Sequence, residues 1–74
     1  IYAMVFFNDD KFNLSSDSQR DRLKERVIGS MERNGERNAL LYVDGRVSHG
    51  DVVKLTSMLR ECGVRYANLV AKAL

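Results

Sequence analysis

The sequence predicts an α+β domain in which two helices pack on one face of a four- or five-stranded mixed sheet. Three short apolar runs, at residues 1–7, 39–43 and 66–71, have the length of strands. Between them lie two longer stretches whose apolar residues recur every three or four positions, which is the spacing of amphipathic helices. The expected order is strand, strand, helix, strand, helix, strand.

The second half of this order reads as a parallel crossover unit. Residues 39–43 are apolar but too few for a helix, and Asp44-Gly45 closes them as a turn would. Ser48 with Asp51 three residues later has the pattern of a capping box, so the following helix should begin at His49. About 13 helical residues rise roughly 20 Å, which matches a strand of about six residues.

The apolar stripe of this second helix should face the sheet, with Leu55 and Leu59 among the most buried residues. Its members are spaced along one side of the helix: Val52, Leu55, Met58, Leu59 and Cys62. Gly63 lies where a left-handed C-terminal cap is needed, and Val64 can close back on Leu59. Residues 66–71 then form the last strand.

The first half should contain a hairpin and a polar helix. Residues 1–7 are apolar on both alternate faces, residues 8–11 form a four-residue loop, and residues 12–14 return as a short strand. Ser16, with Gln19 three residues later, predicts the start of a helix that runs to about Asn34, where Gly35 can stop it. Its apolar stripe is narrow: Leu23, Val27, Ile28 and Met31.

Length, charge and cysteine content exclude several classes of structure and function. Seventy-four residues make one small domain, without any apolar run long enough to span a membrane. A net charge of +2, with both signs mixed along the first helix, argues against a nucleic-acid partner. Cys62, the single cysteine, excludes an internal disulfide, and its place on the apolar stripe is typical of a buried small hydrophobe.

The sequence also argues against catalysis and against a metal or cofactor site. His49 is the single histidine, and one nitrogen ligand does not make a metal site. The loop that starts at Gly45-Arg46-Val47 resembles the start of the acylphosphatase signature, but the second glycine and the helical arginine of that signature are missing. We therefore expect no catalytic, cofactor-binding or metal-binding residue, with an acylphosphatase-like enzyme as the least favoured alternative.

The crossover unit resembles the periplasmic domain of the ExbD/TolR family. The resemblance rests on a strand that ends in Asp44, on Val52-Val53 opening a helix, on Gly63, and on the apolar strand at 67–70. The preceding strand, acidic turn, short strand and polar helix follow the family order, so the resemblance covers nearly the whole chain.

This resemblance implies a non-catalytic domain on the periplasmic side of the bacterial inner membrane. In that family a transmembrane helix before the domain carries the proton-conducting aspartate and contacts an ExbB/TolQ-like channel subunit. The chain would then be the periplasmic part of a longer, single-pass protein that couples proton-motive force to a TonB- or TolA-like energy transducer or to peptidoglycan. The alternative of a different class is a ring-forming or scaffold module of a secretion machine.

Partner binding is expected at the last strand and at the strand-end acid. The residues concerned are Tyr66, Asn68, Leu69, Val70 and Asp44, although turn chemistry is the competing interpretation of Asp44. The last strand has no proline and no charge before Lys72, so at a sheet edge it would be open to strand addition, with the Asn68 amide as one donor. The same edges, together with the two-sided apolar strand at 1–7, predict a homodimer.

Overall fold

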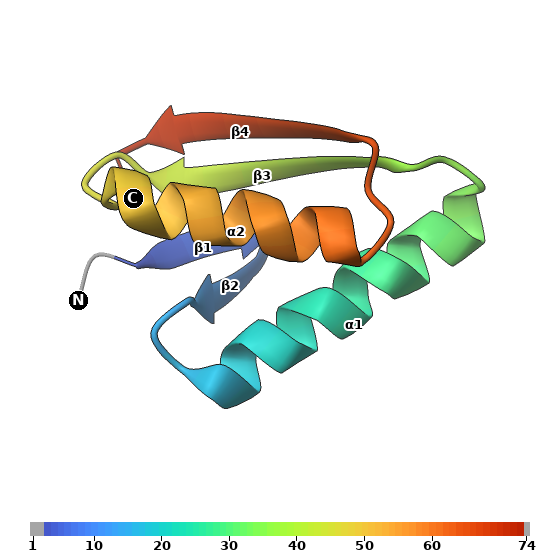
Figure 1. Cartoon of the computed structure of the whole chain (residues 1–74), viewed down its shortest axis with the longest axis horizontal. Coiled ribbons are helices and arrows are strands. Elements are labelled where there is room, and N and C mark those ends of the chain that lie inside the picture. Colours follow the sequence, from blue (N-terminus) through green and yellow to red (C-terminus); the bar gives the residue numbers. More distant parts are fainter. Residues whose placement is uncertain (1–2, 74) are drawn as a thin grey trace.

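The structure is a computed structural model that describes residues 3–73, so Ile1 and Tyr2 of the expected first strand lie outside the described residues. The described residues form four strands and two helices in the order expected from the sequence. Figure 1 shows how these elements are arranged. Their bounds are β1 (Met4–Phe7), β2 (Asp10–Asn13), α1 (Asp17–Asn34), β3 (Asn38–Asp44), α2 (His49–Glu61) and β4 (Tyr66–Lys72).

The strands form one mixed sheet in the order β2-β1-β3-β4. β1 is antiparallel to both β2 and β3, whereas β3 and β4 are parallel and are joined by α2. Both helices lie on the same side of the sheet, and none of the described residues forms a helix on the other side (Figure 1). The predicted fold class, two helices on one face of a mixed sheet, is confirmed, with four strands.

The β1–β2 turn is tighter than the sequence suggested. Phe7 pairs with Asp10, so the loop contains only Asn8 and Asp9, and β2 begins at Asp10. The predicted four-residue loop and a second strand restricted to 12–14 are therefore wrong. Both loop residues have positive φ, 50° and 71°, a conformation that Asn and Asp tolerate better than most residues and that matches the twist of a two-residue hairpin.

The core lies between the sheet and the helices. Leu55 and Leu59 of α2 are 2% and 1% exposed, which confirms that they are among the most buried residues. From α1, Leu23 and Val27 are fully buried. Ile28, expected on the same stripe, is 39% exposed, because it lies about 100° around the helix from Val27 and beyond the reach of the sheet.

The start of α1 is tied to the hairpin by Gln19. The Ser16 hydroxyl accepts a hydrogen bond from the Gln19 amide (3.4 Å), as the capping pattern predicts. The Gln19 side chain does not complete the box: its Oε1 accepts from the Asn13 amide (2.7 Å) at the end of β2. At the other end Gly35, with φ 70°, donates to the Met31 carbonyl (2.8 Å) and stops the helix.

The caps of α2 follow the sequence closely. The Ser48 hydroxyl accepts from the Asp51 amide (3.1 Å), and the helix begins at His49 as predicted. After the last turn Gly63 has φ 96°, and the Val64 amide donates to the Leu59 carbonyl (3.1 Å). This is a Schellman arrangement, and both Val64 and Leu59 belong to the core, so the predicted closing contact is formed.

Candidate interaction site

β4 is an edge strand with little protection against pairing. It is bonded to β3 on one side and is last in the sheet order on the other. Over its seven residues it has no proline, and its one charged residue is Lys72 at the end. The opposite edge, β2, has four residues and carries Asp10 and Lys11. Short and charged edges resist strand addition, so β4 is the more accessible edge of the two.

The hydrogen bonds at the two ends of β4 show which backbone groups remain free. The Tyr66 amide donates to the Arg37 carbonyl (3.2 Å), and the Lys72 carbonyl accepts from the Gly45 amide (2.9 Å). Both Tyr66 and Lys72 therefore turn their backbone groups toward β3. Because the ladder of a parallel pair repeats every two residues, the even-numbered residues of β4 all use their amides toward β3.

The Asn68 amide therefore belongs to the β3–β4 ladder, and the expectation that it would serve an added strand is wrong. The odd-numbered residues direct their amides and carbonyls to the free edge: Ala67, Leu69 and Ala71. Sequence reasoning could not assign these roles, because the alternation is visible in the sequence but its phase is set by the pairing with β3.

The four residues of β4 that the sequence selected lie on two different faces. Tyr66, which is 73% exposed, and Asn68 lie with half-buried Val70 on the side of the sheet that carries no helix. Leu69 lies on the opposite side, where it packs against the core. The four side chains therefore do not form one surface. What they share is the backbone of the edge strand β4.

Asp44 is not placed on the accessible surface. It is 3% exposed, and its carboxylate accepts from Arg46 through Nε (3.0 Å), Nη2 (2.8 Å) and the backbone amide (2.9 Å). These hydrogen bonds lower the pKa of Asp44 from 3.8 to about 2. The carboxylate closes the β3–α2 turn, which favours the structural interpretation of this residue over a partner contact.

The side of the sheet without helices is a second exposed surface, which we call the open face. On β3 the odd-numbered residues from Ala39 to Val43 are buried, whereas Leu40 and Tyr42 are 46% and 36% exposed. The run 39–43 is therefore a half-buried strand, with one side against the core and the other on the open face. The Lys72 ammonium lies 4.7 Å from the centre of the Tyr42 ring on this face.

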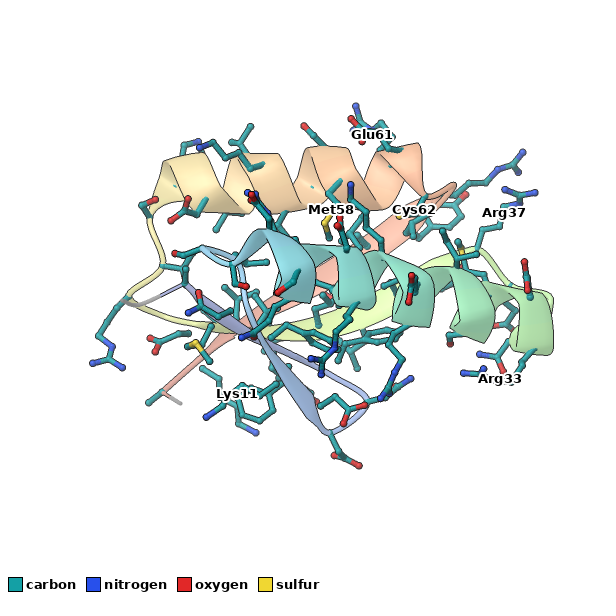
Figure 2. All side chains as sticks on the ribbon, turned by 90° about the horizontal axis from the view of Figure 1, so that it is seen from below. Lys11, Arg33, Arg37, Met58, Glu61 and Cys62 are labelled. Atoms are coloured by element: carbon teal, nitrogen blue, oxygen red, sulfur yellow. The ribbon has the colours of Figure 1, made fainter. Side chains whose placement is uncertain are left out.

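The remaining candidates lie apart from the β4 edge. His49 is exposed in the first turn of α2, and no cluster of three or more metal-ligating side chains occurs within residues 3–73. Cys62 packs against the core near Met58 (Figure 2), and burial raises the pKa of its thiol. No helix in the described part of the chain is long and apolar enough to span a membrane.

Comparison of the chain with models of protein families, with curated proteins and with solved structures gave no match.

Proposed function

We propose that this chain is a non-catalytic, periplasmic domain of an ExbD/TolR-like inner-membrane protein, and that it relays force by docking an energy transducer at the β4 edge. The observation that carries the docking proposal is the free backbone ladder of Ala67, Leu69 and Ala71, on an edge whose one charged residue is Lys72 at its end. The periplasmic location and the coupling to a proton-driven channel subunit rest on the sequence resemblance.

Strand addition suits a module that must hold a partner under load. Main-chain hydrogen bonds supply affinity with little dependence on the partner's side chains. The edge is also anchored, because β4 pairs with β3 over all seven of its residues, and Leu41 and Val43 of β3 are buried in the core. A segment added to β4 would therefore pull on the best-supported part of the sheet.

The test is amide hydrogen exchange of this chain with and without the periplasmic part of a TonB-like or TolA-like transducer. In the free chain the amides of Ala67, Leu69 and Ala71 should exchange quickly, while Asn68 and Val70 exchange slowly. Binding should slow the first group and leave the second unchanged, which is a pattern that docking through side chains alone would not produce.

A matched pair of variants separates the edge from the neighbouring face. Ala67→Pro removes one outward amide and should weaken transducer binding by about tenfold or more. Asn68→Lys changes the next residue, on the open face, and should bind as the unmodified chain does. Transducer binding that is insensitive to Ala67→Pro, or the absence of any binding by either transducer, would contradict the proposal.

We further propose that the chain forms a homodimer through the same edge. A second copy can satisfy the free ladder of β4 in the same way as a transducer segment. Sedimentation equilibrium should then show a dimer that Ala67→Pro weakens and that added transducer displaces. A chain that stays monomeric at high concentration would contradict the dimer and leave transducer docking to be judged by hydrogen exchange.

A further inference from the structure

The open face carries an apolar row that crosses the whole sheet. Lys11 of β2 pairs with Phe6 of β1, Phe6 pairs with Tyr42 of β3, and Tyr42 pairs with Val70 of β4. Paired residues of neighbouring strands have their side chains on the same face. Figure 2 shows Lys11 on the side of the sheet away from α2. The middle of the row, Phe6 and Tyr42, is therefore aromatic, and its two ends lie on the edge strands β2 and β4.

Two positive charges lie on or over this row. Lys11 ends it at β2, and Lys72 extends over the Tyr42 ring near β4. Of the carboxylates on the described strands, Asp10 is paired with Arg26 of α1, and Asp44 is buried against Arg46. The described strands thus present no exposed carboxylate on the open face. Asp9, in the β1–β2 turn, lines the hollow beside the row together with Lys72, so its exposed carboxylate offsets part of this positive charge.

Beside the row lies a hollow that extends to the end of α1. Its lining includes the apolar or aromatic side chains of Leu40, Tyr42 and Tyr66 and polar side chains that include Asn68, Ser30 and Asp9. Within residues 3–73, the exposed fraction is 46% for Leu40 and 73% for Tyr66. Exposed apolar side chains gathered around a hollow are typical of a surface that another protein covers.

We propose that the open face docks an amphipathic helix of a partner protein, one that carries two acidic residues about two turns apart with apolar residues between them. Lys11 and Tyr42 are two strands apart, about 10 Å at the usual strand spacing. Seven helical residues rise about 10.5 Å, so two acids that are seven positions apart match this distance and lie on one face of the helix. The residues three and four positions after the first acid lie between the two acids on that face, and these should be apolar.

A helix fits this face better than the alternatives. An extended segment laid across the sheet would leave its backbone amides and carbonyls without partners, whereas a helix satisfies its own. If a second copy docked through the same face, its own Lys11 and Lys72 would lie near those of the first copy, and the like charges would repel. On this face the described strands offer a nucleic acid two lysines, Lys11 and Lys72, and affinity for phosphates grows with the number of charges neutralised.

The experiment titrates the 74-residue chain, observed by amide NMR, with a synthetic helical peptide that has two glutamates two turns apart and two leucines between them. Two further probes are the same peptide with lysines in place of glutamates, and oligothymidylate. The acidic peptide should shift the resonances of Phe6, Tyr42 and Val70. It should bind at least about tenfold more tightly than the lysine peptide, and oligothymidylate should not bind.

Variants assign the effect to the two lysines. The double change Lys11→Glu with Lys72→Glu should abolish the preference for the acidic peptide, and the double change to Arg should retain it. Arg22→Glu with Lys54→Glu alters the net charge equally on the exposed surfaces of α1 and α2 and should have no effect. Ala67→Pro should also have no effect, which separates this docking from strand addition at β4.

Several results would overturn the proposal. Equal binding of the acidic and lysine peptides would reduce the face to a nonspecific apolar surface, and tighter binding of oligothymidylate would assign it to nucleic acid. Shifts confined to Ala67, Leu69 and Ala71 would place the peptide at the β4 edge instead. A dimer that Tyr42→Glu dissociates would assign the face to a second copy. No binding up to about 1 mM peptide would exclude helix docking altogether.

Discussion

Arg46 holds the carboxylate of Asp44 through two side-chain donors, with Nε 3.0 Å from Oδ1 and Nη2 2.8 Å from Oδ2. The two residues are separated by Gly45 alone, so the pair closes the turn in which β3 ends and the chain moves toward α2. A carboxylate that is hydrogen-bonded in this way stabilises the turn, so the free energy of unfolding should depend on whether Asp44 is ionised.

The stability of the protein should therefore fall in acid through Asp44. Its pKa in the folded chain, about 2, is below the ordinary value of 3.8, so the unfolded chain takes up the proton first. The contribution of Asp44 is complete above about pH 4 and is lost as the pH falls through 2. Urea unfolding at pH 5, 3 and 2 should show this loss, and Arg46→Ala should reduce it. An identical pH dependence in Arg46→Ala would show that the pair does not set the pKa.

Truncation of Leu59 should destabilise the domain severely. Leu59 is 1% exposed in the core, and Leu to Ala changes at such positions cost about 2 to 5 kcal/mol. Val53, on the exposed side of the same helix, is 50% exposed, so Val53→Ala should change the free energy of unfolding by less than about 0.5 kcal/mol. Urea unfolding measures both. Similar losses for the two variants would mean that α2 does not pack as described.

Adding one methyl group should have opposite effects at two glycines. Gly63 has φ 96°, and a Cβ there would meet Arg37 Nη1 at 3.0 Å, so Gly63→Ala should cost about 1 to 2 kcal/mol. Gly29 lies inside α1, where the nearest atom, Arg33 Nη1 at 3.4 Å, ends a flexible side chain. Gly29→Ala should stabilise the helix by about 0.5 to 1 kcal/mol. Thermal or urea unfolding distinguishes the two signs, and a stabilising Gly63→Ala would contradict the left-handed cap.

Proline should discriminate between adjacent residues of β4. The phase of the β3–β4 ladder directs the Asn68 amide to β3, so Asn68→Pro should break the pairing and cost about 3 kcal/mol or more. Ala67 turns its amide to the free edge, and Ala67→Pro should change stability by no more than about 1 kcal/mol. The free energies of unfolding of the two variants test the phase of the ladder directly. The reverse order would mean that the roles of odd and even residues are exchanged.

The ends of α2 and the turn of the hairpin show where local sequence suffices. Ser48 and Gly63 determine where α2 starts and stops, because a capping hydroxyl and a left-handed glycine act within one turn of the chain. The hairpin was harder to predict, because neither Asn8 nor Asp9 is a glycine. Their positive φ values are fixed by the pairing of Phe7 with Asp10, which is a contact between strands.

The candidate site illustrates the same division. The sequence showed that residues 66–71 form an uncharged strand without proline, and local composition is enough for that. It could not show that Asn68 is paired internally or that Ala67 faces outward, since a shift of one residue exchanges these roles without changing the composition. Nor could it show that Asp44 is buried, because burial depends on how β3 meets the turn that contains Arg46.

The sequence by itself determined the element order, the helix caps and the apolar stripe of α2, because these depend on periodicity and on groups a few residues apart. Only the tertiary structure decided that β4 is an edge, which of its amides are free, and that Lys11, Phe6, Tyr42 and Val70 form one row. Those features arise from strands distant in the chain, and their register is fixed when both helices cover a single face of the sheet.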